Sequence, residues 1–159
     1  MQTDVWNILD TCAFFTQMHP NGKIATVTNI KDEIINRQSK QYYSNLKSKG
    51  LKIIEPVTES LDFIKEKAKE TGDLDVLSLT DIKILALGYE LQGTIISDDF
   101  AIQNVSLYNG LEVISCSGKK IKEIRKWKYR CSACKLVTDG KNETCNICGS
   151  SDIFRIKAK

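Results

Sequence analysis

VWNIL at residues 5–9 and GTIIS at residues 93–97 are the two stretches that decide the fold of this chain. Each is a short apolar run with β-branched residues, bounded by polar or glycine positions, which is typical of a buried strand in a parallel sheet. Asp10 follows the first run directly, and Asp98 and Asp99 follow the second. The sequence therefore predicts two buried parallel strands that end at acidic residues.

Two weaker runs, KIATVT at 23–28 and LEVIS at 111–115, predict further strands. Helical patterns lie between the strands, and the best defined of them begins with Ser78 and Asp81 in a capping-box arrangement. Strands that alternate with helices indicate an α/β fold, in which helices flank a parallel sheet. The expected helices span residues 11–18, 29–37, 39–49, 58–70 and 78–91.

Length and composition limit the class of protein. The 159 residues, 42% of them hydrophobic, suffice for one ordinary α/β domain and a small appendage. No apolar run approaches the length that spans a bilayer, so we expect no membrane partner. No signal peptide precedes the chain, and we therefore expect a cytoplasmic protein whose thiols stay reduced.

Four cysteines close the chain in two C-x₂-C pairs, separated by ten residues: Cys131 with Cys134, and Cys145 with Cys148. Two such pairs, brought together by a hairpin, form a tetrahedral thiolate site for zinc. Two disulfides are the alternative, which a reducing cytoplasm disfavours. With all four positions taken by sulfur, this Zn²⁺ would fold a small Cys₄ zinc ribbon and take no part in chemistry.

Charge is divided unevenly along the chain. Residues 1–118 carry 11 Lys and Arg against 16 Asp and Glu, a net charge of −5, whereas residues 119–159 carry 12 against 4, a net charge of +8. An acidic domain joined to a basic tail fits a phosphodiester enzyme in which metal binding and RNA capture are divided between modules. We therefore expect an α/β domain at 1–118, a basic linker at 119–128 and the zinc ribbon at 129–159.

Acidic residues gather where the sheet should end. In open parallel sheets the ligand lies at the carboxyl ends of the strands, so Asp10 and the Asp98–Asp99 pair should share one edge. Asp81 opens a helix and Glu33 lies one turn into another, and both can project toward the same crevice. Such carboxylates repel one another unless a divalent cation neutralises them, which favours Mg²⁺ or Mn²⁺ and hydrolysis of phosphodiesters.

Each acid also has a structural interpretation. Asp81 can stabilise a helix N-terminus, Asp98 can cap a helix and Glu33 can face solvent. Asp10 is harder to explain in this way, because a carboxylate directly after an apolar strand is partly buried and needs a partner or a metal.

Four segments together resemble the PIN-domain ribonucleases. Followed by a Cys₄ ribbon, they are similar to the archaeal Nob family, whose members trim the 3′ end of small-subunit ribosomal RNA precursors. The resemblance implies a PIN-like α/β sheet and a metal-dependent endoribonuclease that leaves a 3′ hydroxyl. It also implies precursor rRNA, the assembling small ribosomal subunit and assembly-factor proteins as partners. The segments are ILDTCAFF at 8–15, VTNIKDEI at 27–34, LSLTDIKILALGYEL at 77–91 and IISDDFAIQNV at 95–105.

The resemblance assigns roles by position. It places metal-binding, catalytic acids on Asp10, Glu33, Asp81 and the Asp98–Asp99 pair, and supporting polar residues on Thr11, Ser97 and Asn104, beside Gln103. Many PIN domains show a hydroxyl residue, any residue, then the acid, which favours Asp99 over Asp98. Both acids stay open at this stage.

The basic linker predicts how RNA is held. Lysines and arginines there can neutralise phosphates, and the interleaved aromatic rings either stack on unpaired bases or pack inside the protein. Cys12 and Cys116 have no partner at ligand spacing and are interpreted as small buried residues. The candidate RNA-binding residues are Lys126, Trp127, Lys128, Tyr129 and Arg130.

Two other functions remain open. A PIN-type toxin ribonuclease would need an antitoxin partner and usually lacks a ribbon. A non-catalytic RNA-binding scaffold would keep the fold with vestigial acids, and metal-dependent cleavage separates it from both enzymes.

Overall fold

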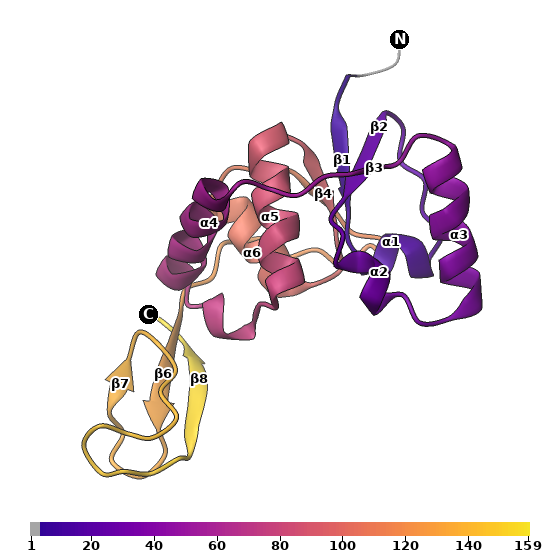
Figure 1. Cartoon of the computed structure of the whole chain (residues 1–159). Coiled ribbons are helices and arrows are strands. Elements are labelled where there is room, and N and C mark those ends of the chain that lie inside the picture. Colours follow the sequence, from indigo (N-terminus) through magenta and orange to yellow (C-terminus); the bar gives the residue numbers. More distant parts are fainter. Residues whose placement is uncertain (1–3) are drawn as a thin grey trace.

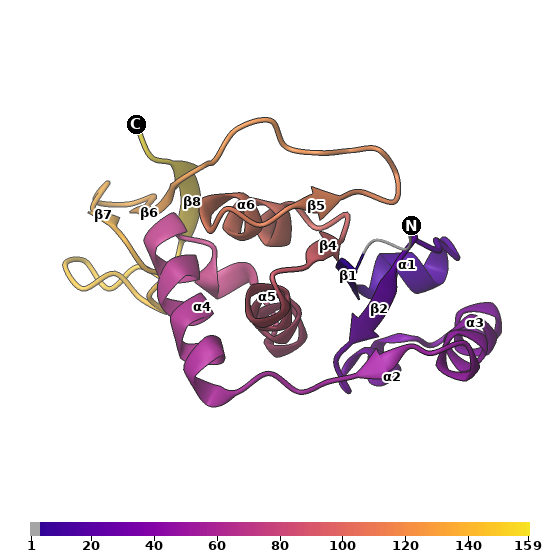
Figure 2. The same cartoon turned by 90° about the horizontal axis from the view of Figure 1, so that it is seen from above.

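A five-stranded parallel sheet forms the centre of the computed structural model, which describes residues 4–159. The strand order is β3-β2-β1-β4-β5, so the chain starts in the middle of the sheet, moves to one edge and then crosses to the other (Figures 1 and 2). The predicted parallel sheet is confirmed. The strands are β1 (Trp6–Leu9), β2 (Lys23–Thr26), β3 (Lys52–Ile53), β4 (Thr94–Ile96) and β5 (Val113–Ile114).

Helices cover both faces of the sheet. α5 packs on β1 and β4 with α4 and α6 beside it, while α1 packs against α3 on the opposite side (Figures 1 and 2). The helices are α1 (Thr11–Phe15), α2 (Ile30–Glu33), α3 (Arg37–Ser48), α4 (Thr58–Thr71), α5 (Leu79–Leu91) and α6 (Phe100–Tyr108), with a 3₁₀ turn η1 (Leu74–Val76).

Four of these elements differ from the expectation. One is α2, which ends at Glu33, whereas the expected helix continued to residue 37. The sequence did not indicate β3, because two residues are too few for a periodic pattern. It did not indicate α6 either, since both faces of that helix are largely buried and show no polar stripe. α1 is shorter than expected and ends at Phe15 rather than residue 18.

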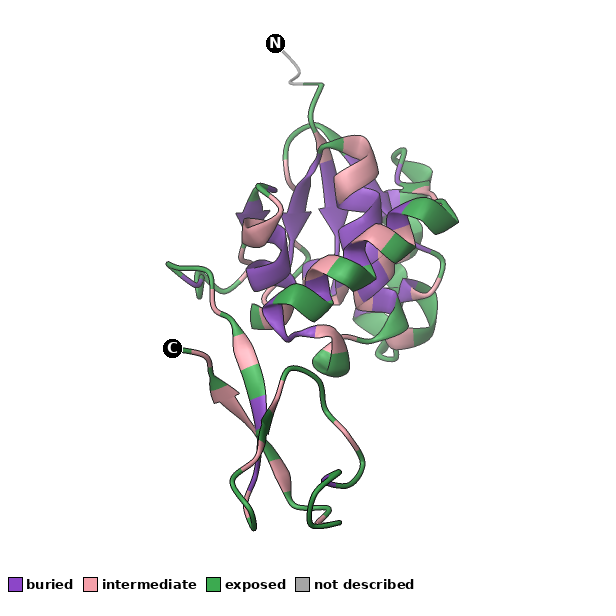
Figure 3. Cartoon of the chain, turned by 90° about the vertical axis from the view of Figure 1, so that its left-hand side faces the viewer, coloured by how far each residue is buried: buried purple, intermediate pink, exposed green. Residues whose placement is uncertain are grey.

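The core lies between the sheet and its helices (Figure 3). Ile8 and Leu9 of β1 and Ile95 and Ile96 of β4 are fully buried, which explains why these strands are continuous apolar runs. Gly88 of α5 lies so close to β4 that an added Cβ would come within 2.7 Å of the Ile95 side chain. α5 therefore lies directly on β4, and the parallel pairing of β1 with β4 brings the carboxyl ends of these two strands together.

The last fifth of the chain forms an antiparallel sheet of order β7-β6-β8, which extends away from the first domain (Figure 3). Its strands are β6 (Trp127–Cys131), β7 (Val137–Thr138) and β8 (Ile153–Lys157). β6 begins at Trp127, within the segment expected to be linker. The buried side chains of this module include Tyr129, Cys131 and Cys145, which is a very small core. Such a module needs a further source of stability.

A buried carboxylate joins the two modules. Asp73, at the end of α4, is 1% exposed and accepts hydrogen bonds from Thr71 and Asn104. Arg155 of β8 forms an ion pair with the same carboxylate. Gly72, with φ +80°, brings the chain so close to β6 that a Cβ would lie 2.3 Å from the Trp127 carbonyl oxygen. The ribbon is therefore seated on the α4–η1 turn.

Among the described residues, no helix combines the length and the apolar character needed to cross a bilayer.

Candidate active site

Asp10 lies at the junction of three elements. It follows β1, caps the start of α1, and its Oδ1 accepts a 2.7 Å hydrogen bond from the Thr11 amide. Its backbone amide donates to the Ile96 carbonyl oxygen of β4 at 3.1 Å. Its Oδ2 accepts a 2.6 Å hydrogen bond from the hydroxyl of Ser97, the residue after β4. The ends of two neighbouring strands therefore hold one carboxylate in place.

Burial strongly affects the charge of Asp10, whose residue surface is only 7% exposed. Burial raises its pKa to about 6, against the lowering effect of the bonds from Ser97 and Thr11, and the charges of Asp81 and Asp99 raise it further. In residues 4–159, no lysine or arginine forms an ion pair with Asp10. A buried carboxylate with two acidic neighbours therefore favours a bound cation at this point.

Glu33 lies in the connection between β2 and β3 and reaches the same edge of the sheet. It is the last residue of α2, and its Oε2 accepts a 2.6 Å hydrogen bond from the Thr11 hydroxyl. Thr11 thus contacts both Asp10 and Glu33. The Thr11 hydroxyl donates its one hydrogen to Glu33, and the Thr11 backbone amide donates to Asp10, so this residue links the two acids.

Asp81 serves the capping box that the sequence indicated. Its carboxylate accepts from the Ser78 amide at 2.7 Å, while its own amide donates to the Ser78 hydroxyl at 3.1 Å. Burial raises its pKa, the Ser78 bonds oppose this, and the charges of Asp99 and Glu33 add to the rise. Asp81 therefore caps α5 and also faces the other acids.

Asp99 and Asp98 point to different surroundings. Asp99 caps α6 by accepting from the Ala101 and Ile102 amides, and its own amide donates to the Ser97 hydroxyl at 3.1 Å. Its charge is felt by both Asp10 and Asp81.

Asp98 instead accepts a 2.6 Å bond from the Ser115 hydroxyl and a 3.1 Å bond from the Ser117 amide. Partial burial raises its pKa, but these bonds outweigh burial and leave the pKa below its ordinary value. The two neighbours thus differ: Asp99 faces the acids, and Asp98 ties down the segment after β5.

The structure therefore couples Asp10, Glu33, Asp81 and Asp99, which we call the acidic cluster. Its donors are carboxylate oxygens, the ligands that Mg²⁺ and Mn²⁺ prefer, so the residues fit such an ion. Among residues 4–159, no three of these carboxylates have oxygen atoms that all lie within 4.8 Å of one another. Binding one ion through three of them would require their side chains to move inward.

The four ribbon cysteines already have the spacing of a metal site. Their Sγ atoms all lie within 4.8 Å of one another. Cys131 and Cys148 are 3.6 Å apart, and Cys134 and Cys145 are 3.5 Å apart. Four thiolates at zinc bonds of about 2.3 Å would be about 3.8 Å apart. Backbone amides of the knuckles lower the pKa of Cys131 to about 6 and also lower that of Cys145, so these two favour the thiolate. The Leu136 amide lowers the pKa of Cys134, but the bond with Cys145 and burial outweigh it and raise that pKa to about 11.

Cys12 and Cys116 form a contact that sequence spacing does not reveal, because they are 104 residues apart. Their Sγ atoms are 3.0 Å apart, and both lie near an Asp98 oxygen. Burial, followed by the bond and the charge from Cys116, raises the pKa of Cys12. Both cysteines are half-buried rather than buried, and with Asp98 they form a group whose ligand atoms all lie within 4.8 Å of one another. The interpretation of the two as small buried residues without a partner is therefore wrong.

Asn104 lies outside the acidic cluster. Its amide nitrogen donates to Asp73 and to the Arg125 carbonyl, and its oxygen accepts from the Arg125 amide at 2.7 Å. Gln103 fixes the linker in the same way, at the Lys119 carbonyl and the Ile121 amide. Asn104 therefore positions the linker and the ribbon rather than the acids. Gln103 also contacts the acid site, because its amide donates a 3.1 Å hydrogen bond to the carbonyl oxygen of Ser97, whose hydroxyl binds Asp10.

The two aromatic side chains of β6 pack against other parts of the protein, and neither is mostly exposed to solvent. Tyr129 is 3% exposed, and its hydroxyl lies 3.5 Å from the Gly72 carbonyl oxygen, so its ring offers no face to an RNA base. The Arg155 guanidinium lies 4.2 Å from the centre of the Trp127 ring and covers one face. Of the two interpretations, the structure supports packing for Tyr129. Three basic residues of this segment are exposed: Lys126, Lys128 and Arg130.

Comparisons with known proteins agree with this geometry. The model of the family "PIN domain of ribonuclease" matches residues 8–91. The chain is 34% identical to the endoribonuclease Nob1 of Pyrococcus abyssi, over 90% of this chain and 89% of that protein. It is 40% identical to ribonuclease VapC1 of Thermoplasma acidophilum, over 62% of this chain and 51% of that one. It is also 38% identical to the 20S-pre-rRNA D-site endonuclease NOB1 of Saccharomyces cerevisiae, over 60% of this chain and 22% of that protein.

Proposed function

Because the chain belongs to the PIN-domain ribonucleases and, within them, to the Nob1 endoribonucleases, we propose that it cleaves precursor small-subunit rRNA to form the mature 3′ end. The reaction would be a metal-dependent hydrolysis of one phosphodiester bond that leaves a 3′ hydroxyl. The yeast relative is named for an endonuclease that acts on 20S pre-rRNA, which supports this choice of substrate. The reaction would take place in the cytoplasm on the assembling small subunit, in company with assembly factors.

The observation that carries the proposal is the hydrogen bond from Ser97 to Asp10 across the ends of β4 and β1. It holds a buried acid at the carboxyl edge of the sheet, where open parallel sheets bind their ligands. Thr11 brings Glu33 to the same place, and the charges of Asp81 and Asp99 reach it. A purely structural carboxylate would instead be expected to pair with a basic side chain.

In this proposal the four acids of the cluster hold one or more Mg²⁺ or Mn²⁺ ions. A bound divalent cation would supply the charge that neutralises the carboxylates and stabilises negative charge on the phosphate. The protein's own contribution is position: Ser97 and Thr11 orient Asp10 and Glu33, and the α5 and α6 caps orient Asp81 and Asp99. We assign Asp98 to holding the segment after β5, outside the ligand set.

The ribbon would take one structural Zn²⁺ through Cys131, Cys134, Cys145 and Cys148 and hold RNA against the first domain. Its small core gives it little stability without metal, so zinc would fold it. Lys126, Lys128 and Arg130 would neutralise phosphates, and the free face of Trp127 would remain for a base. Elemental analysis should find one zinc per chain in protein purified without chelator.

Cleavage selectivity tests the proposal. Parent protein and Asp10→Asn would be incubated with Mn²⁺ and either a precursor rRNA fragment that spans the 3′ boundary or an unrelated RNA of equal length. We expect the parent to cut the precursor and Asp10→Asn to cut neither RNA. Equal cutting of both RNAs by the parent would favour the toxin ribonuclease, to which the similarity with VapC1 points. No metal-dependent cutting would favour the scaffold.

A further inference from the structure

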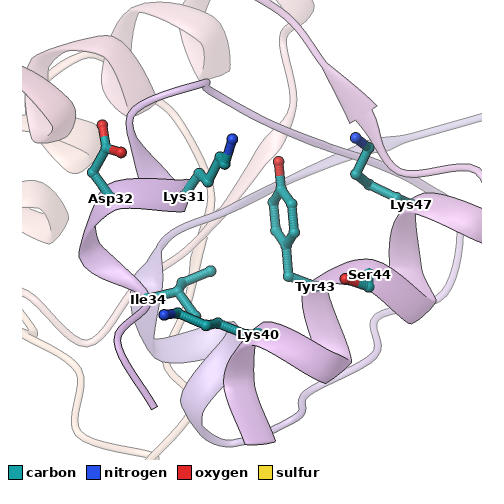
Figure 4. Close-up of a pocket in the computed structure, with 7 residues that line it drawn as sticks. All are labelled: Lys31, Asp32, Ile34, Lys40, Tyr43, Ser44 and Lys47. Atoms are coloured by element: carbon teal, nitrogen blue, oxygen red, sulfur yellow. The ribbon is translucent and has the colours of Figure 1, made fainter. Parts of the chain in front are cut away.

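A groove beside α2 and α3 concentrates positive charge within an otherwise acidic domain. It is a cavity of about 490 Å³ whose lining includes Lys31 of α2 and Lys40 and Lys47 of α3. A second cavity of about 300 Å³ continues it past Arg37 and shares Lys40 and Ser44 with the first. The residues that line the first cavity are Lys31, Asp32, Ile34, Lys40, Tyr43, Ser44 and Lys47 (Figure 4).

The charge of this groove is not balanced by its surroundings. Five of the 11 Lys and Arg in residues 1–118 fall between residues 31 and 49, against two acids, Asp32 and Glu33. Among the described residues, Lys31, Lys40 and Lys47 take part in no ion pair. In Figure 4 the Asp32 carboxylate points away from the lysine amines. The groove therefore suits a polyanion.

The groove also has a rigid, hydrogen-bonding floor. The Tyr43 ring packs against Phe14 of α1 with 5.6 Å between ring centres, and burial raises the pKa of its hydroxyl. In Figure 4 this hydroxyl lies between the amines of Lys31 and Lys47. At neutral pH it remains a donor, so two ammonium groups and a hydroxyl face the same space.

The groove and the acidic cluster share one helix, α2, and α1 contacts both. Glu33 lies on the four-residue helix α2 between Asp32 and Ile34, which both line the groove. α1, which supports Tyr43 through Phe14, begins directly after Asp10. A strand whose scissile phosphate lies at the acidic cluster would therefore pass Lys31 within a few nucleotides.

We propose that this groove binds the phosphate backbone of the RNA strand beside the cleavage site. The inference rests on the proposed function and adds a substrate-positioning surface on the first domain, distinct from the basic linker and ribbon. Lys40 and Lys47 neutralise phosphates, and Tyr43 and Ser44 donate hydrogen bonds. Ile35, which is 77% exposed beside the continuation of the groove, offers an apolar contact for a ribose or a base.

The test compares two matched pairs of lysines. Lys40→Gln with Lys47→Gln removes two charges from the groove. Lys65→Gln with Lys69→Gln removes two from exposed positions on α4, on the other side of the sheet. Each pair is built into Asp10→Asn protein so that RNA stays intact, and affinity for the precursor fragment is measured against salt. Thermal unfolding checks that both pairs remain folded.

We expect the groove pair to weaken binding about tenfold and to reduce the slope of log affinity against log salt by about 1.4, because each phosphate contact with a single strand contributes about 0.7. The α4 pair should change neither. With Asp10 intact, the groove pair should raise KM for the precursor and leave kcat unchanged.

Equal effects of both pairs, or no effect of the groove pair, would overturn the inference and assign the groove to a protein partner or to solvent. Groove-dependent RNA binding by a protein that never cleaves would sustain the inference while refuting the proposed function. Selective cleavage of the precursor whose KM does not change in the groove pair would support the proposed function and refute the inference about the groove.

Discussion

The Ser97 hydroxyl donates a 2.6 Å hydrogen bond to Oδ2 of Asp10, joining two residues that are 87 positions apart in the sequence. Ser97 is fully buried, and its hydroxyl also accepts from the Asp99 amide. One side chain therefore sets the geometry of two acids at the ends of neighbouring strands. The order of these strands in the sheet makes the contact possible, since β1 and β4 pair directly.

Ser97→Ala should raise the pKa of Asp10, because the bond from Ser97 lowers it in the parent. We expect the acidic limb of the pH–rate profile to move to higher pH and stability to fall by about 1–3 kcal/mol. Ser106→Ala is the matched control, since the Ser106 hydroxyl is also buried but bonds within its own helix. If both variants keep the parental pH profile, Ser97 does not tune Asp10.

Asp99→Asn should reduce Mn²⁺-dependent cleavage at least about 100-fold, whereas Asp98→Asn should stay within severalfold of the parent. Asparagine caps helices as well as aspartate does, so Asp99→Asn removes charge and keeps the start of α6. Rates are compared at saturating RNA, with circular dichroism as the check on folding. The opposite ranking of the two variants would place Asp98 in the cluster.

The sequence predicts the strands and the acids because both depend on local pattern. Apolar runs that end at Asp10 and Asp98 imply a sheet edge, and two C-x₂-C pairs imply a metal-bound module. The choice between Asp98 and Asp99 depends on where the side chains point, which only the turn into α6 determines.

The contacts between the modules could not be predicted from pattern. The Asp73–Arg155 pair joins residues that are 82 positions apart, and no periodic pattern in the sequence predicts it. Asn104 resembled a catalytic helper by its place in a motif, yet its partners are Asp73 and the linker backbone. Long-range polar contacts of this kind are decided by tertiary packing.

Asp10 should make the metal-free protein less stable as pH rises. Its pKa goes from an ordinary 3.8 to about 6 on folding, so the native state holds the extra proton between these values. Relative to Asp10→Asn, the free energy of unfolding of the parent should fall across this window by roughly 3 kcal/mol and then level off.

Mn²⁺ should therefore raise the Tm of the parent more at pH 7.5 than at pH 5, because protons compete with the ion for the carboxylate. Thermal unfolding with and without Mn²⁺ measures both effects. Parallel pH profiles for the parent and Asp10→Asn would show that Asp10 titrates normally.

Arg155→Met should detach the ribbon from the α4–η1 turn and leave Asp73 buried without its cation. Breaking a buried pair costs about 3–5 kcal/mol, and because Arg155 keeps a quarter of its exposure we expect roughly 2–3 kcal/mol. Asp73→Asn should recover part of this loss in the double variant. Urea unfolding of the parent, the two single variants and the double variant measures the coupling free energy, and proteolysis within residues 119–126 reports detachment of the ribbon. Additive single effects would mean that the two side chains do not interact.

The most direct measurement of the central claim is the mapping of RNA ends after Mn²⁺-dependent incubation with precursor small subunits, using the parent and Asp10→Asn in parallel. We predict one new 3′ end, at the mature boundary of the small-subunit rRNA and with a free hydroxyl, which appears with the parent and not with Asp10→Asn. Cleavage at the parental rate by Asp10→Asn, or new ends scattered away from that boundary, would contradict the account.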